Sequence, residues 1–387
     1  MPGDRGLLRI KSGHHHRVSA VELFFDLVFV FAVTQLSHLL MEHFTLLGAA
    51  ETLLLMLAVW WVWMYTAWCT NWLDPEKRPV CFMMLALMAA GLILSASIPK
   101  AFEARGLAFA AAYTGIQVGR TGFFLWAVRG HDRLTRNFQR IFAWLAAAAV
   151  WWIAGAFAEG AERLALWAFA FSLEFVAPAV AFWTPGLGRS TTEDWDVEGG
   201  HMAERASLFI IIALGESVLV TGATFSELEW TAPTVAAFAV SFGGSLAMWW
   251  LYFNAAADAG TQTISSSSDP GRIARLSYTY IHLFLVAGII VAAVADEFVL
   301  AHPTGPVDAK TVIAIAGSVA LYLVGHALFA WSISGRPPLS SVIGIVVAMA
   351  LAPASAFLSP LVLMAAATAI LVGVAVVETP ALVEGRG

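Results

Sequence analysis

Long apolar runs separated by short polar segments dominate the hydropathy pattern of this sequence. A helix needs about 20 mostly apolar residues to cross the hydrocarbon core of a bilayer. Runs of this length predict helices at residues 20–40, 46–68, 80–99, 106–129, 138–158, 162–183, 203–223, 232–254, 276–298, 309–332, 339–357 and 359–378. Only Ser359-Pro360 separates the last two, so residues 339–378 could also form one span. The pattern predicts an all-α integral membrane protein of about twelve transmembrane helices.

Composition and loop charge agree with this prediction. Hydrophobic residues make up 59% of the 387 residues and charged residues only 12%, whereas a soluble domain has about 25% charged residues. If the N-terminus is cytoplasmic, sixteen of the 21 basic residues fall on the cytoplasmic side and four on the other. This asymmetry obeys the positive-inside rule. We therefore expect the lipid bilayer as the partner of this chain, with both termini in the cytoplasm.

Several functional classes receive no support from the sequence. The net charge of −6 does not favour nucleic acid as a partner. The two cysteines, Cys69 and Cys81, flank a short loop, and no Cys/His spacing suggests a metal site. Glycine-rich pieces lack the spacing of a phosphate loop. We find no credible nucleophile–base pair, and we expect neither an enzyme nor a cofactor. The oligomeric state does not follow from the sequence.

The sequence also contains an ordered internal similarity. The second and eighth predicted helices each carry a double tryptophan followed by a tyrosine and an asparagine: Trp60, Trp61, Tyr65 and Asn71 in one, Trp249, Trp250, Tyr252 and Asn254 in the other. Similar pieces follow in the same order in the next helices. We therefore predict two parallel-related six-helix repeats (6+6). The expected segments are a basic N-terminus 1–19, a first half 20–183, a linker 184–202, a second half 203–378 and a tail 379–387.

Charged side chains within spans are costly and are functional candidates by default. Ser19 and Glu22 have the spacing of a capping box, which favours a structural role for Glu22. Asp26 lies ~9 Å into its helix, too deep to be a cap. Arg120 lies ~13 Å from the cytoplasmic end of its helix, and the repeat makes His326 its counterpart between the halves. We expect a carboxylate to neutralise Arg120, with Asp26 favoured over Glu174 and Glu216.

Further candidates for binding a substrate or protons lie in both halves. Glu216 falls near the membrane midplane beside Gly215, which allows close helix approach or a local break. Glu174 is similarly deep, and His282 lies ~9 Å into its helix. For each, helix–helix packing is the alternative role. The candidates for lining a cavity are the aromatic residues Trp60, Trp61, Trp249, Trp250 and Tyr252.

The first span, VELFFDLVFVFAVTQLSHLL, resembles the opening of the bacterial low-temperature-requirement A (LtrA) family. HMAERASLFIIIALGES, YTYIHLFLVAGI and GHALFAW resemble the same family further along the chain. The resemblance implies a multi-pass protein of the bacterial inner (plasma) membrane, linked by name to growth in the cold, without a settled activity. It carries over these residues: Glu22, Asp26, Gln35, Glu204, Arg205, Gly215, Glu216 and His282.

Together these features favour a secondary transporter or permease for a small molecule or ion. Its candidates for substrate or proton handling are Asp26, Arg120, Glu174, Glu216, His282 and His326. The structural candidates are Ser19, Glu22, Gln35, Glu204, Arg205 and Gly215. Two alternatives stay open: a membrane-embedded enzyme or lipid-related factor, and a structural or sensory membrane protein for cold adaptation. The substrate and the coupling ion cannot be read from the sequence.

Overall fold

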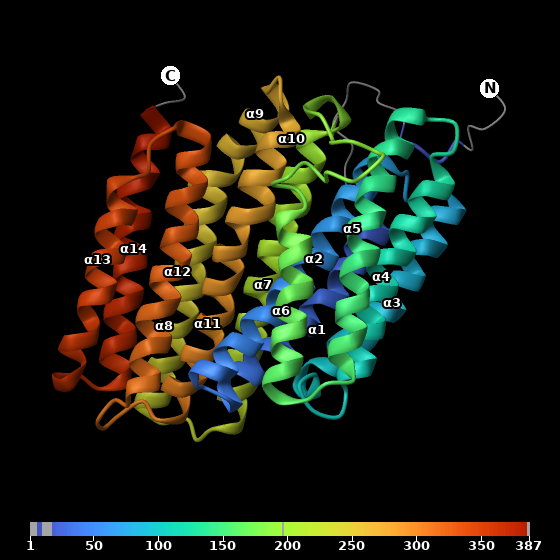
Figure 1. Cartoon of the computed structure of the whole chain (residues 1–387). Coiled ribbons are helices and arrows are strands. Elements are labelled where there is room, and N and C mark those ends of the chain that lie inside the picture. The colour runs from blue at the N-terminus through green and yellow to red at the C-terminus, as the bar shows by residue number, and fades with distance from the viewer. Residues whose placement is uncertain (1–5, 10–17, 196, 385–387) are drawn as a thin grey trace. The chain divides into compact units, whose positions relative to one another are not determined.

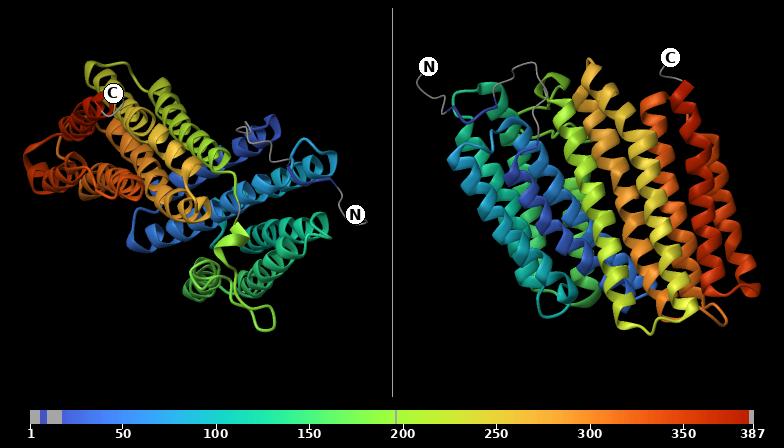
Figure 2. Two further views of the ribbon diagram at one scale, coloured as in Figure 1. Left: turned by 90° about the horizontal axis from the view of Figure 1, so that it is seen from above. Right: turned by 180° about the vertical axis from the view of Figure 1, so that it is seen from behind.

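The computed structural model describes residues 6–9, 18–195 and 197–384, and in these residues the fold is all-α (Figure 1). The chain forms two compact units. Unit 1 comprises Met1–Met202 with Asp269–Gly271, and unit 2 comprises Ala203–Ser268 with Arg272–Gly387. Within each unit the helices run side by side, up and down, joined by short loops (Figure 2).

Unit 1 is built from six long helices. They are α1 (Ala20–Glu42), α2 (Leu46–Trp72), α3 (Arg78–Ser97), α4 (Gly106–Ala127), α5 (Asp132–Ala156) and α6 (Gly160–Val176). Helix α1 packs against α2 and α3, and the order then follows the chain, α3 on α4, α4 on α5 and α5 on α6. Large aromatic side chains fill its core: Trp60, Trp61, Trp63, Trp152 and Trp167 are each at most 1% exposed.

Unit 2 holds most of α7 (Gly199–Glu227), the second half of α10 and all the remaining helices. The α-helices after α7 are α8 (Ala232–Trp250), α9 (Ala257–Ser266), α10 (Pro270–Ile273), α11 (His282–Ala301), α12 (Ala309–Ser334), α13 (Leu339–Ala354) and α14 (Pro360–Glu384). Helices α11 and α12 approach most closely. A Cβ at Gly288 would lie 2.7 Å from the backbone nitrogen of Tyr322, and a Cβ at Gly325 would lie 2.8 Å from that of Leu285. Only glycine permits this backbone contact.

The polar stretch 255–275 was expected to be a long loop, and this is wrong. Helix continues from α8 through a π-helical segment, Leu251–Ala256, into α9, and a second π-helical segment, Ala274–Ile281, leads into α11. Hydroxyl side chains on α9 bond back to carbonyls one turn earlier, Thr261 to Ala257 and Thr263 to Ala259. These bonds satisfy the polar side chains locally, so the helix extends beyond its apolar run.

The sixth helix is shorter than the predicted range 162–183. Helix α6 ends at Val176, and the chain then turns, with positive φ angles of 54° at Ala181 and 48° at Phe182. Pro178 explains the end, because its ring cannot continue a helical hydrogen-bond ladder. Glu174 consequently lies in the last turn of α6 rather than in the middle of a long span.

Ten helical stretches among the described residues are long and apolar enough to cross a membrane. They include α1, α2, α3, α5 and all the long helices of unit 2, but not α4 or α6. Apolar faces are also left uncovered, as on α13, where Ile343, Val346 and Met349 are 53%, 63% and 55% exposed. Exposed apolar faces of this kind suit a hydrocarbon solvent. The chain is therefore a multi-pass membrane protein, while the number twelve stays a prediction.

Candidate functional site

A buried ionic cluster closes one end of unit 1. Glu22 is fully buried and accepts hydrogen bonds from the backbone N–H and the hydroxyl of Ser19, 2.9 and 2.8 Å long. It is therefore a helix-capping residue, as predicted. Its carboxylate also forms an ion pair with Arg9, 3.0 Å from Nη2, and lies 3.0 Å from Nε2 of His201. No pattern in the sequence had connected these three residues.

Asn71 orients the His201 ring. The Asn71 amide oxygen accepts the backbone N–H of Glu198 at 2.8 Å, so the amide NH2 faces the carbonyl of Glu198 at 2.9 Å and Nδ1 of His201 at 3.3 Å. The other ring nitrogen, Nε2, lies 3.0 Å from the Glu22 carboxylate and 3.1 Å from Nη2 of Arg9. Arg9 supplies the positive charge beside Glu22.

Arg120 is 2% exposed in the core of unit 1. Its guanidinium donates to the Val62 carbonyl, to the Thr66 hydroxyl at 3.1 Å and to the Gln117 side-chain oxygen at 2.6 Å. It also lies 5.3 Å from the centre of the Tyr65 ring, a cation–π distance. No carboxylate of the described residues is within ion-pair distance of it, so the expected direct ion pair is wrong.

Gln117 is the link that the sequence interpretation missed. Its oxygen accepts from Arg120, and its NH2 donates to Glu174 at 3.1 Å. The Glu174 carboxylate also accepts from the Tyr113 hydroxyl at 2.7 Å and from the Trp152 indole N–H at 2.9 Å. Among the three acids considered, Glu174 is therefore the one connected to Arg120, through an amide. A carboxylate with three donors and a guanidinium with three acceptors form a satisfied polar core.

Asp26 is not among the hydrogen-bond partners of Arg120. It is fully buried, and its Oδ1 accepts the indole N–H of Trp63 at 2.7 Å. Trp63 stacks on Trp60, with ring centres 5.1 Å apart, and Trp61 packs edge-on against Phe171. The first tryptophan cluster is thus core packing around a buried acid.

In unit 2, His282 is fully buried at the junction of the second π-helical segment with α11. Its Nδ1 lies 2.8 Å from the Ser277 carbonyl oxygen, which can only accept, so Nδ1 carries the proton. Nε2 must then accept from the Tyr252 hydroxyl at 2.8 Å. Ser207 lies 3.4 Å beyond that hydroxyl. Ser207, Tyr252 and His282 form a hydrogen-bonded chain that we call the histidine relay.

Both hydrogen-bond partners of His282 come from π-helical stretches, which recur at functional sites. Tyr252 belongs to Leu251–Ala256, and Ser277 to Ala274–Ile281. Aromatic rings of Tyr252, Tyr278 and Phe329 surround the imidazole at 4.8–5.6 Å between ring centres. The relay therefore lies in an apolar setting, where a change in proton number has a large electrostatic effect.

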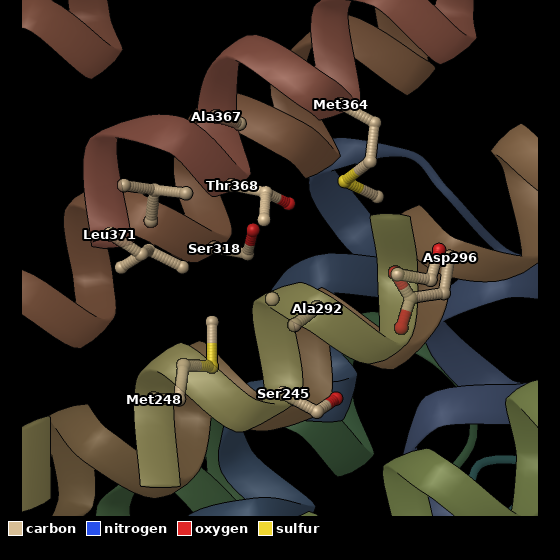
Figure 3. Close-up of a pocket in the computed structure, with 12 residues that line it drawn as sticks. Ser245, Met248, Ala292, Asp296, Ser318, Met364, Ala367, Thr368 and Leu371 are labelled. Atoms are coloured by element: carbon tan, nitrogen blue, oxygen red, sulfur yellow. The ribbon is translucent and has the colours of Figure 1, made fainter. Parts of the chain in front are cut away.

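A small polar cavity lies further along α11 (Figure 3). Asp296 is 4% exposed, and its Oδ2 lies 3.2 Å from the Thr221 hydroxyl oxygen. The cavity measures about 20 Å³, enough for one water-sized occupant. Four helices, α8, α11, α12 and α14, supply its polar lining: Ser241, Ser245, Asp296, Ser318 and Thr368. The sequence interpretation missed Asp296, although its position inside a predicted span was the available signal.

His326 contributes to a third group in unit 2. Its Nδ1 lies 3.1 Å from the Ser341 hydroxyl and its Nε2 lies 3.5 Å from a Glu378 carboxylate oxygen. The hydroxyls of Ser340 and Ser341 approach the other oxygen of Glu378 at 2.6 and 2.9 Å. His326 therefore shares its acid with two serines on α13.

The other predicted residues differ in burial. Glu216 is 6% exposed and Arg205 is fully buried on α7, whereas Glu204 and Gln35 are half-buried. A Cβ at Gly215 would meet no atom within 4 Å. Of the aromatic candidates, Trp249 and Trp250 are 40% and 43% exposed, and none of the five lines the cavity. The described residues contain no group of three His, Cys, Asp or Glu that could hold a metal ion.

Comparisons with known proteins place the chain in a family. Residues 17–376 match the family described as Bacterial low temperature requirement A protein (LtrA). An uncharacterized protein of Rhizobium meliloti (strain 1021) is 39% identical over 378 residues, covering 97% of this chain and 92% of that protein. No solved structure matches the chain. The family match covers nearly the whole chain, so the protein belongs to the bacterial LtrA family.

Proposed function

We propose that this LtrA-family protein is a secondary transporter whose unit 2 carries a proton or another small cation. The observation that carries the proposal is the placement of two titratable groups on one helix. His282 and Asp296 are fourteen residues apart on α11, so they are separated by ~21 Å and lie within ~40° of the same helix face. This separation covers most of a hydrocarbon core of ~30 Å. Both side chains are buried inside unit 2 rather than turned to lipid.

Polar groups on the neighbouring helices lie between these two ends. Ser241, Ser245 and Met248 on α8 line the cavity at helical spacing, and Tyr252 follows them in the adjoining π-helical segment. The Tyr322 hydroxyl donates to the Met248 carbonyl, where the cavity ends. We call the histidine relay, this contact and the Asp296 cavity together the polar track of unit 2.

The polar track is interrupted, which favours a carrier over an open channel. Leu285 and Ile289 occupy the α11 face between His282 and Asp296 and are at most 1% exposed. An ion cannot pass dry apolar side chains without rearrangement. Transfer along the track would therefore need a conformational change, as alternating access provides.

The relay gives His282 a defined way to gain a proton. The Tyr252 O–H bond breaks as an Nε2–H bond forms on His282, and the Tyr252 oxygen takes a replacement proton from the side of Ser207. The Nδ1–H bond to the Ser277 carbonyl is retained and orients the ring throughout. A neutral histidine held in one tautomer suits a reversible proton acceptor.

A proteoliposome assay tests the proposal. The purified chain is reconstituted with a pH-sensitive dye inside, and a pH jump is applied outside. We expect protein-dependent proton flux that falls at least tenfold in His282→Gln and in Asp296→Asn, and severalfold in Tyr252→Phe. The matched control is His302→Gln, an exposed histidine directly after the same helix. Absence of flux in wild type under imposed proton and cation gradients, or equal flux in all variants, overturns the proposal.

One arrangement supports the alternative of a membrane-embedded enzyme. Ser341, His326 and Glu378 are the residue types of an acyl-transfer triad, and they lie in contact. However, Ser341 is fully buried, and its hydroxyl is also within bonding distance of the acid, which competes with activation by histidine. A fluorophosphonate probe tests this alternative. Labelling that disappears in Ser341→Ala would favour an enzyme.

The number of spans, the internal repeat and the orientation in the membrane belong to the same proposal. We infer twelve spans in two parallel-related halves, with both termini on the cytoplasmic side of a bacterial inner membrane. The basic asymmetry of the loops supports the orientation, and six long helices in unit 1 support the first half. The family description supports a contribution to growth in the cold, which deletion of the gene and growth at low temperature would test.

A further inference from the structure

We propose that the Asp296 cavity is a binding site for one small monovalent cation of the Na⁺ type. The inference names the coupling ion of the proposed transporter and rests on that function for its role. The binding itself follows from the cavity alone. In Figure 3, side chains from four helices of unit 2 surround the cavity, with Asp296 on α11 and hydroxyls on α8, α12 and α14.

The Thr221 hydroxyl is a poor proton donor to Asp296. This hydroxyl has a single proton, yet its oxygen lies 2.7 Å from the Ser217 carbonyl and 3.2 Å from Asp296 Oδ2. The shorter bond to the carbonyl takes that proton, because a carbonyl oxygen can only accept. Two lone-pair oxygens then face each other at 3.2 Å. A cation, or a proton on the carboxylate, must lie at or near this contact to make it favourable.

The other hydroxyls of the lining also present oxygen lone pairs. Ser318 donates its proton to the Ile315 carbonyl at 2.9 Å, and Thr368 donates to the Val240 carbonyl at 3.3 Å. Their oxygens are therefore left as acceptors toward the cavity. Ser241 is 2% exposed and lines the cavity beside Asp296, so its hydroxyl oxygen adds a further ligand for an ion held there.

Charge and ligand type select a hard monovalent cation. The lining contains one carboxylate and no Lys, Arg or His. Carboxylate and hydroxyl oxygens suit alkali and alkaline-earth ions rather than soft metals. Calcium and magnesium sites use several carboxylates or keep several waters, whereas the neighbouring acid, Glu297, is bonded to Thr224 and does not line the cavity. A single negative charge is balanced by a single positive one.

Size excludes larger occupants. A cavity of about 20 Å³ holds one water-sized particle, so an organic substrate or an ammonium with alkyl groups does not fit. Its apolar walls, including Met248, Met364 and Leu371, would hold the ion largely dehydrated among the oxygens. The geometry points to an ion that leaves most of its water behind, which disfavours strongly hydrated divalent ions.

Thermal unfolding of the full chain in detergent tests binding without requiring transport. Chlorides of Na⁺, Li⁺, K⁺ and choline are compared at constant ionic strength. We expect Na⁺ to raise Tm with a saturable dependence on concentration, with a smaller effect of K⁺ and none of choline. Asp296→Asn should abolish the Na⁺-dependent shift. Asp308→Asn is the matched control, because asparagine keeps the helix cap of α12 and the residue lies outside the cavity.

Further variants keep the inference testable if Asp296→Asn does not fold. Ser318→Ala and Thr368→Val should each raise the Na⁺ concentration for half-maximal stabilisation at least threefold, and equilibrium dialysis with radioactive Na⁺ should give one ion per wild-type chain. Absence of Na⁺ stabilisation in wild type, or unchanged dependence in all the cavity variants, overturns the inference. Stabilisation by acid alone, lost in Asp296→Asn, would assign the site to a proton and also overturn it. Sodium binding without flux in proteoliposomes would refute transport but support the site.

Discussion

Replacing Arg120 by methionine is expected to destabilise the protein by ~3–5 kcal/mol, the usual cost of removing one partner from a buried charged network. The structure explains the size of the effect. The change removes donors to the Val62 carbonyl, the Thr66 hydroxyl and Gln117, whose oxygen then has no other hydrogen-bond donor in this network. It also leaves Glu174 without its nearby positive charge.

The coupling between Arg120 and Glu174 can be calculated from the path through Gln117. The two hydrogen bonds are 2.6 and 3.1 Å long, and the amide between them spans ~2.3 Å, so the charged groups are at most ~8 Å apart. At an effective dielectric constant of ~20, unit charges at this distance interact by about 2 kcal/mol. A direct ion pair at ~4 Å would give about 4 kcal/mol.

A double-mutant cycle measures this coupling. The variants are Arg120→Met, Glu174→Gln and their combination, and the free energy of unfolding is followed as SDS is added to mixed micelles. We expect a coupling of ~1–2 kcal/mol. We also expect the coupling to fall when the cycle is repeated on Gln117→Leu, because the bridging amide is gone. A coupling below ~0.3 kcal/mol, or one that is unchanged without Gln117, would refute an interaction transmitted by this amide.

Three further predictions concern other parts of the structure. Gly288→Ala should destabilise the protein by ~1–3 kcal/mol, because its Cβ would meet the Tyr322 backbone at 2.7 Å. Gly317→Ala, with no atom within 4 Å, should be neutral or up to ~1 kcal/mol stabilising. Unfolding in SDS measures both, and equal effects would contradict the close packing. Arg9→Ala should cost ~1.5–3 kcal/mol and speed hydrogen exchange at residues 6–9, because the ion pair to Glu22 holds this segment; unchanged exchange would contradict that role. Reporter fusions should read outside after residues 45, 104 and 160 and inside after 75, 133 and 335, and inversion at two or more sites would refute the topology.

The sequence determined the helices and the environment of the chain. Long apolar runs can satisfy their backbone only as helices when lipid is the solvent, so the all-α fold and the approximate ends of most helices follow from local information. The capping role of Glu22 was also local, because Ser19 lies three residues away. The predicted ends failed where polar residues stay helical, as in α9, or where Pro178 stops a helix early. Hydropathy records neither the local hydrogen bonds of the polar side chains nor the conformational restriction that proline imposes.

Only the tertiary structure decided which buried polar groups meet. Arg120 and Asp26 lie at similar predicted depths, yet the rotation of α4 in the packed bundle directs the guanidinium to Gln117 and α2. Glu22 and His201 are 179 residues apart, and Thr221 and Asp296 are 75 apart. Depth follows from counting residues along one helix, but partnership depends on how neighbouring helices are rotated and spaced. Those quantities are fixed by side-chain packing and by close glycine contacts between helices, such as that of Gly288 on α11 with Tyr322 on α12.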